Sequence, residues 1–179
     1  MQKGDWDTAI VFYEQALHFE PWNPRIHYSL GLAFHQKFLA ERKSAQRERA
    51  ITEGEQALRL APRNASILES LGVWYAEWGA FDKAISFLKE AIEQDPFNLS
   101  PYRNLAKVCQ VAGEYSLQED EVEKASSYLE EGEKVEEYLN DAEKRSLRPL
   151  NWDIKEVLTV IEEIKELKGE ILSLREGED

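Results

Sequence analysis

Small and apolar residues recur along this chain at two fixed intervals. The alanines Ala16, Ala57 and Ala91 are 41 and 34 residues apart, and two other residue types repeat the same pair of numbers. These are the leucines Leu30, Leu71 and Leu105 and the prolines Pro21, Pro62 and Pro96. The longer interval exceeds the shorter by about two helical turns, so it returns each side chain to nearly the same face. The pattern therefore predicts an array of similar helical units stacked along one axis.

The unit at residues 65–98 shows what each copy contains. Apolar residues recur at helical spacing on both sides of Gly79, so each half predicts an amphipathic helix. The two inward faces are Leu68, Leu71, Gly72 and Tyr75, then Phe81, Ala84, Ile85, Leu88, Ala91 and Ile92. The small members of these faces let two antiparallel helices approach closely, and Pro96 ends the second helix. The unit is therefore predicted to be a helical hairpin.

These positions resemble the tetratricopeptide repeat. The matching residues are Leu71, Gly72, Tyr75, Gly79, Phe81, Ala84, Ala91 and Pro96, and the likeness extends over about residues 4–144. The resemblance implies an all-α superhelical array of about eight helices and a non-enzymatic scaffold that binds a protein or peptide partner. It does not extend to the clamp by which some members bind acidic chaperone tails, because Tyr28 and Leu32 stand where that clamp has lysine and asparagine.

The markers divide the chain into an array at residues 1–148 and a C-terminal segment at residues 149–179. The array comprises a half repeat at residues 4–23 and complete repeats at residues 24–64, 65–98 and 99–145. The turn of the first complete repeat is expected around residues 41–44. In the last repeat Gly113 is expected to turn the chain. Ser116 and Glu119 there have the spacing of a capping box, which predicts a second helix running to about Lys144.

The half repeat holds a second helix without its first. After Gly4, its apolar residues take the positions of the second-helix face named above: Trp6, Ala9, Ile10, Tyr13, Ala16 and Leu17. Each helix of such an array is buried by neighbours on both sides, so a half repeat leaves an apolar stripe uncovered. The sequence is therefore expected to be part of a longer polypeptide. Alternatively, a second copy covers this exposed N-terminal half repeat and makes a homodimer.

Residues 152–175 predict one further amphipathic helix, after a break at Pro149. Its apolar residues recur at spacings of three and four: Ile154, Val157, Leu158, Ile161, Ile164, Leu167, Ile171 and Leu174. Such a helix would cap the open end of the array with one apolar and one polar face. The same period also suits a homodimer through residues 154–174 or a docking helix for another protein. The residues from Arg175 onward are expected to fray.

Charge and composition limit the partners of the chain. The formal net charge is −13, and nearly all of this excess follows Gly113. Such an acidic field repels phosphate backbones, so no nucleic-acid partner is expected. No apolar run is long enough for a membrane span. The lone Cys109 falls at a core position, without a second cysteine for an internal disulfide. The localisation stays open between the cytoplasm and attachment to a bacterial membrane protein.

Motifs of catalysis and cofactor binding are absent from the sequence. It holds no glycine-rich phosphate loop, Cys-x-x-Cys, His-Glu-x-x-His or Gly-x-Ser-x-Gly pattern. His27 and His35 fall on one flank of a predicted helix, but a metal site needs further ligands. Adjacent acids such as Glu130 and Glu131 point in different directions on a helix, which does not suit acid–base catalysis. Neither an enzyme nor a cofactor or metal site is therefore expected.

A binding groove is the functional feature that the sequence does predict. In stacked helical hairpins the first helix of each pair lines the concave side. By helical phase the side chains expected there are Arg25, Tyr28, Leu32 and His35, then Ser66, Glu69, Val73 and Ala76, then Ser100, Arg103, Lys107 and Gln110. With three cations and one anion, this groove would suit an extended peptide with a carboxylate and one or two apolar side chains.

The junctions between repeats support a second interpretation. The strings Glu-Pro-Trp-Asn-Pro and Asp-Pro-Phe-Asn resemble those in repeats appended to bacterial membrane polymerases and O-antigen ligases of cell-surface polysaccharide. This resemblance implies an accessory domain of a glycan-assembly enzyme, whose chemistry lies in segments absent from this sequence. Self-association through the C-terminal helix is a further alternative to the peptide-binding scaffold.

Overall fold

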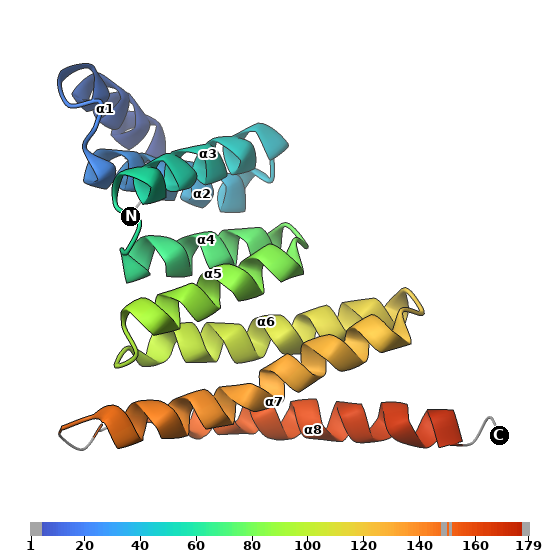
Figure 1. The fold of residues 1–179 in the computed structure, drawn as a ribbon. Helices are drawn as coiled ribbons and strands as arrows, with labels where there is room; N and C mark the ends of the chain where they lie inside the picture. Colours follow the sequence, from blue (N-terminus) through green and yellow to red (C-terminus); the bar gives the residue numbers. More distant parts are fainter. Residues whose placement is uncertain (1–4, 148–149, 151, 177–179) are drawn as a thin grey trace.

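The computed structural model describes residues 5–147, 150 and 152–176, and these residues contain eight α-helices and no strand. The helices are α1 (Asp5–Phe19), α2 (Pro24–Glu41), α3 (Ser44–Leu60), α4 (Ala65–Glu77), α5 (Phe81–Gln94), α6 (Leu99–Gln118), α7 (Val122–Arg145) and α8 (Lys155–Glu176). They stack in chain order into an elongated array (Figure 1). The predicted all-α array is confirmed. Gly4, Pro149 and the tail at residues 177–179 lie outside the described residues.

Consecutive helices pair into three antiparallel hairpins. The most extensive contacts join α2 to α3, α4 to α5 and α6 to α7, whereas α1 packs on α2 and α8 packs on α6 and α7. The junctions between hairpins lie along one edge of the array, at the left of Figure 1, and the hairpin turns lie along the other. The first turn falls between Glu41 and Ser44 as predicted, with Arg42 at a φ of 57°.

Each hairpin begins with the same helix cap. Asn23, Asn64 and Asn98 precede α2, α4 and α6 in an extended backbone conformation. Each side-chain oxygen accepts a hydrogen bond from a backbone N–H of the first turn, at 3.0 to 3.2 Å. This satisfies donors that the helix itself leaves without acceptors. In the recurring Pro-x-Asn of the junctions, the proline therefore ends one helix and the asparagine caps the start of the next.

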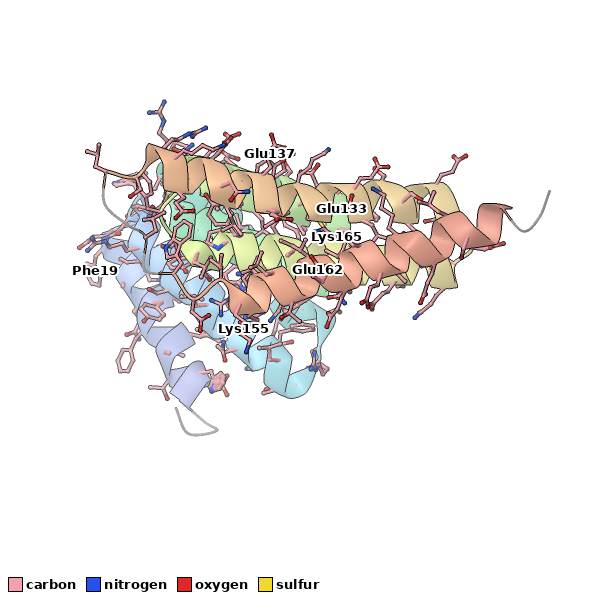
Figure 2. The ribbon with its side chains drawn as sticks, turned by 90° about the horizontal axis from the view of Figure 1, so that it is seen from below. Phe19, Glu133, Glu137, Lys155, Glu162 and Lys165 are labelled. Atoms are coloured by element: carbon pink, nitrogen blue, oxygen red, sulfur yellow. The ribbon has the colours of Figure 1, made fainter. Side chains whose placement is uncertain are left out.

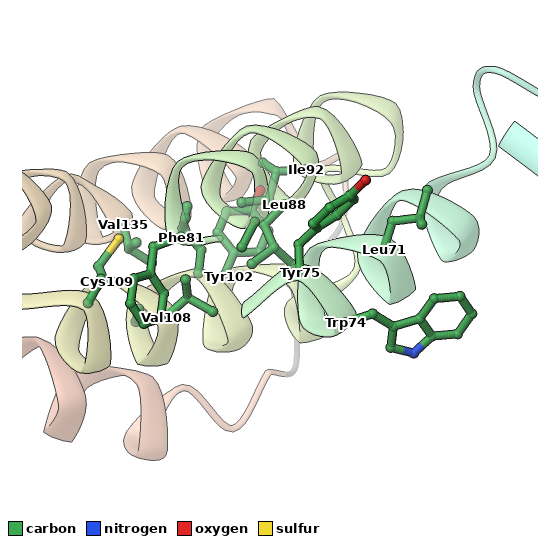
Figure 3. Packing of buried hydrophobic residues seen from close by; sticks show 14 of the residues in the cluster. Leu71, Trp74, Tyr75, Phe81, Leu88, Ile92, Tyr102, Val108, Cys109 and Val135 are labelled. Atoms are coloured by element: carbon green, nitrogen blue, oxygen red, sulfur yellow. The ribbon is translucent and has the colours of Figure 1, made fainter. Parts of the chain in front are cut away.

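Glycines mark the closest approaches between helices. A Cβ at Gly72 would lie 2.6 Å from Cγ of Leu88, so α4 and α5 can pack this closely only where α4 has no side chain. In the same way, a Cβ at Gly132 of α7 would lie 2.6 Å from Cδ1 of Ile164 on α8. Larger side chains fill the space around these contacts, and Figure 3 shows Leu88 beside Ile92 and other buried residues of this core. One continuous core therefore runs through the stack.

The turn of the third hairpin lies further along the chain than the sequence predicted. α6 continues through Gly113 to Gln118, and the turn falls at residues 119–121 with Asp120 at a φ of 62°. Ser116 is buried within α6, and α7 begins without a side-chain cap. The predicted turn at Gly113 and capping box at Ser116 are wrong. Gly113 is instead a close helix contact, where a Cβ would lie 2.7 Å from Leu129.

Gly79 occupies a turn conformation that favours glycine, and this gives a first prediction. Its φ is +76°, and no atom lies within 4 Å of a Cβ built on it. Gly79→Ala is expected to lower the free energy of unfolding by about 1 kcal/mol, because alanine is strained at this φ. Gly169→Ala is the matched control: its surroundings are equally open but it lies inside α8, so it should raise that free energy by up to about 1 kcal/mol. Urea denaturation measures both, and shifts of the same sign would contradict this account.

Candidate functional site

The two histidines of α2 hold neighbouring helices together. Nδ1 of His27 lies 2.7 Å from a carboxylate oxygen of Glu53 on α3, and its Nε2 lies 2.9 Å from the carbonyl of Pro21. Nε2 of His35 lies 2.6 Å from a carboxylate oxygen of Glu77 on α4. Both histidines are buried, so His35 does not line an open groove. Within the described ranges, no three histidine, cysteine or acidic side chains meet in a way that could hold a metal ion.

Most of the predicted groove residues bond to a neighbouring first helix of the array or to α8. The hydroxyl of Tyr28 on α2 lies 2.8 Å from that of Ser70 on α4. Glu69 on α4 accepts hydrogen bonds from Ser100 and, at 2.9 Å, from Asn104 on α6. The predicted groove residues that bond to a neighbouring first helix or to α8 are Tyr28, His35, Glu69, Ser100, Arg103, Lys107 and Gln110. They form a polar ladder that joins α2, α4, α6 and α8.

The last step of this ladder neutralises two cations. The carboxylate of Glu156 on α8 accepts hydrogen bonds from Lys107 and, at 3.1 Å, from Arg103. Lys107 and Arg103 hold the pKa of Glu156 below its ordinary value of 4.5. Gln110 donates to Glu163 on the same helix at 3.0 Å. Two of the three cations that the sequence assigned to the groove are therefore paired within the chain, and the expected excess of positive charge is lost at this end.

A different set of residues faces away from the second helices, and we call it the first-helix face. By helical phase it lies opposite the fully buried Leu30, Leu71 and Leu105. Its members are Arg25, Ser29, Leu32 and Gln36 of α2, then Ser66, Ser70, Val73 and Glu77 of α4, then Ser100, Asn104, Lys107 and Val111 of α6. Of the predicted site, Arg25 and Lys107 are exposed here and Leu32 and Val73 are half-buried.

The predicted site lacks six residues of this face: Ser29, Gln36, Ser70, Glu77, Asn104 and Val111. The predicted set was rotated around each helix toward the next hairpin, so it mixed groove residues with residues of the ladder. The repeat interval does relate the missed residues, since Gln36, Glu77 and Val111 are again 41 and 34 residues apart. That signal shows equivalence between helices. It does not show which flank a neighbouring helix covers.

α8 closes one end of the array. Its buried side chains are Val157, Val160, Ile161, Ile164 and Ile171, and they face α6 and α7. Figure 2 shows Glu162 and Lys165 on this helix beside Glu133 and Glu137 of α7, and all four are charged. The predicted cap is confirmed. The apolar stripe proposed for a homodimer through residues 154–174 packs against α6 and α7 of the same chain. Leu174 lies outside the residues with described side chains.

A small cavity opens where α7 extends past the junction between α5 and α6. Its volume is about 290 Å³, and its walls include Ile92, Pro96, Tyr102 and Tyr138. The hydroxyl of Tyr102 donates to the carbonyl of Pro96 at 2.9 Å, which fixes this wall. The cavity follows from the length of α7, which has 24 residues where α5 has 14. It is at the lower size limit of small-molecule sites.

Sequence relatives cover the chain partially or are much longer than it. Protein CTR9 homolog of Arabidopsis thaliana is 25% identical over 172 residues, which are 94% of this chain and 15% of that protein. Photosystem I assembly protein Ycf3 of Cuscuta gronovii is 30% identical over 86 residues, 48% of each chain. This chain thus spans less than half the length of either relative. The resemblance of its junctions to repeats of polysaccharide polymerases and ligases stays a prediction.

Solved structures share the arrangement of helices. A crystal structure of MamA has a TM-score of 0.53 at 21% identity, covering 82% of this chain and 72% of that one. MamA of Desulfovibrio magneticus RS-1 has a TM-score of 0.50 at 20% identity, covering 75% and 68%. At these identities the likeness concerns the fold alone. None of the described helices is both long and apolar enough to cross a membrane.

Family models match the repeats directly. A model described as "TPR repeat" matches residues 1–37, and one described as "Tetratricopeptide repeat" matches residues 35–98. Together they cover more than half of the chain, and the eight helices of the described residues are paired as such repeats require. The chain therefore belongs to the tetratricopeptide repeat family, whose members are scaffolds for contacts between proteins.

Proposed function

We propose that this chain binds an extended segment of a partner protein along the first-helix face. The observation that carries the proposal is the equivalence of this face on the three first helices, α2, α4 and α6. Ser29, Ser70 and Asn104 are equivalent, as are Leu32, Val73 and Lys107. A polypeptide in extended conformation presents its own groups at regular intervals, so a regular surface can bind it with repeated contacts.

The chemistry of the face favours a partner with apolar side chains and few charges. The hydroxyl of Ser29 can bond the backbone of a peptide, and so can the hydrogen-bonding capacity that Ser70 and Asn104 keep beside their bonds to Tyr28 and Glu69. Val111 is half exposed and offers an apolar contact. Arg25 is exposed and has no acid partner among the described residues, whereas Lys107 is paired with Glu156. One carboxylate of the partner is therefore expected near Arg25, at the α2 end of the face.

A random peptide library tests this proposal, because it samples many candidate partner segments at once. Peptides of 12 residues (about 40 Å when extended) are displayed on phage and selected on the immobilised chain, and the binders are measured by fluorescence anisotropy. Val111→Arg and Arg25→Glu are expected to weaken the selected peptides at least about tenfold. Both positions are exposed, so the variants should fold.

Ser86→Arg is the matched control, because Ser86 is an exposed residue of the second helix α5. Its binding should equal that of the wild type. The proposal fails if selection enriches no peptide, or if Ser86→Arg weakens the selected peptides as much as Val111→Arg does. Circular dichroism of each variant separates loss of binding from loss of fold.

A further inference from the structure

The outer face of α1 exposes several large apolar side chains. The exposed fractions are 50% for Val11, 64% for Phe12 and 87% for Phe19, and 79% for Trp22 in the junction that follows. On the opposite side of α1, Ile10 is buried and packs into the core. Single exposed apolar residues are ordinary, but a group of four on one helix and the junction after it marks an interaction surface.

Equivalent positions elsewhere in the chain are covered by other helices. By the repeat interval Phe12 corresponds to Phe87 of α5 and Tyr128 of α7. The ring of Phe87 stacks on Tyr75 of α4 with a centroid distance of 5.5 Å. The hydroxyl of Tyr128 donates to Asp82 of α5 at 2.8 Å. In both cases the contact goes to a helix that comes earlier in the array, and nothing in the described part of the chain makes that contact with α1.

The outer face of α1 is also free of charge. By helical phase it consists of Thr8, Val11, Phe12, Gln15 and Phe19. Two acids of α1 lie on the flank that faces the array, where Asp7 pairs with Lys37 and Glu14 pairs with Arg49. A two-fold dimer places the same surface of both copies in contact. In a chain of net charge −13, an uncharged face is the surface that two copies can share without repulsion.

The other end of the array does not complement α1. α8 turns most of its apolar side chains inward, although Leu158 and Leu172 are exposed. It carries Lys155, Glu162 and Lys165 as exposed residues (Figure 2). Packing the apolar face of α1 against them would remove these charges from water, and the ion pair between Lys165 and Glu162 would offset that cost only in part. A head-to-tail chain of copies is therefore disfavoured, and contact between two like ends remains.

We propose that two copies of this chain associate through the outer faces of their α1 helices, about a two-fold axis close to Gln15. Phe12 and Phe19 would pack against the partner copy, and Trp22 would cover the margin of the contact. The first-helix face lies on α2, α4 and α6 and takes no part in this contact. Self-association is thus independent of the proposed peptide binding, and a dimer would present two binding faces.

Light scattering over a concentration series tests the proposal on the 179-residue chain. The wild type is expected to be a dimer with a dissociation constant on the order of 10 μM. Added salt should strengthen it, because salt screens the repulsion between two acidic chains. Phe12→Glu is expected to be a folded monomer. Phe97→Glu is the matched control, an aromatic residue 46% exposed in another junction, and it should remain a dimer.

A cysteine cross-link tests the geometry. The native Cys109 is buried, so a cysteine introduced at an exposed site is the reactive one. Gln15→Cys is expected to form a disulfide between two copies under mild oxidation, and Ser86→Cys on α5 is expected to form none, although it still dimerises. A wild type that is monomeric at every concentration would overturn the proposal and assign the face to a different occupant. A dimer that Phe12→Glu leaves intact would overturn it as well.

Discussion

Trp74→Ala is expected to lower the free energy of unfolding by about 3 to 5 kcal/mol. The indole of Trp74 is 3% exposed and stacks on the ring of His35 with a centroid distance of 5.2 Å. A Cβ at Gly31 would lie 3.1 Å from this indole, and one at Gly54 would lie 2.8 Å from it. The ring therefore fills the space that two glycines leave between the first hairpin and α4. Alanine would leave a cavity there, because the helix backbones cannot close it.

This substitution should also divide the array into two parts. Each hairpin contacts mainly its neighbours, so a weakened contact lets one part unfold before the other. Hydrogen exchange is expected to show α1, α2 and α3 losing protection before α4 to α7. Trp78→Ala is the control. Trp78 is 40% exposed and lies under the guanidinium of Arg47 at 4.5 Å, so its loss should be below about 1 kcal/mol. Equal losses for the two variants would contradict the account.

Ile164→Asp is expected to release α8 from the array, at a cost to its docking of at least about 4 kcal/mol. Ile164 is fully buried, and its Cδ1 lies 2.6 Å from the place of a Cβ on Gly132. A carboxylate at this position would be buried without a partner. α8 contacts α6 and α7, so the earlier hairpins should remain folded after it leaves.

The reactivity of the single cysteine, Cys109, measures the release of α8. A Cβ on Gly132 would lie 3.0 Å from Cβ of Cys109, so the thiol lies in the region that Ile164 covers. Burial raises the pKa of Cys109 to about 12, and the wild type should react slowly with a disulfide reagent. Ile164→Asp should react faster by roughly a hundredfold or more. Leu172→Asp on the same helix is the control, since Leu172 is 51% exposed. A protected thiol in Ile164→Asp would show that α8 stays docked.

Local signals predicted much of this fold. The repeat interval located the hairpins. The first turn was also predicted where it falls, between Glu41 and Ser44, although no glycine or proline marks that turn. The third turn was predicted at the wrong place because a glycine such as Gly113 can have either of two structural roles. The residues next to it in sequence do not show which role it has. A glycine can end a helix, or it can let another helix approach. Only the contact with Leu129 in the folded chain shows that Gly113 lets another helix approach.

The candidate site was predicted less well than the fold, because its residues depend on neighbours in space. Arg25, Leu32, Val73 and Lys107 belong to the first-helix face as expected from helical phase. Whether that face binds a peptide remains a prediction. Glu156 lies 53 and 49 residues from the two cations that it pairs with, and this interval is not a repeat interval. No periodicity in the sequence relates these residues.

Sequence by itself determined the type of every unit, because a helical hairpin is specified by apolar spacing, small contact residues and caps within about 40 residues. It also determined that α8 has one apolar and one polar face. The tertiary structure alone decided which flank of each first helix is covered by the next hairpin. It also decided that Glu156 neutralises the cations of α6. The uncovered apolar stripe predicted for the half repeat proves to be Val11, Phe12 and Phe19, because the predicted Ile10 is buried. These outcomes depend on how rigid helices are rotated against each other, and that rotation is set by packing between hairpins.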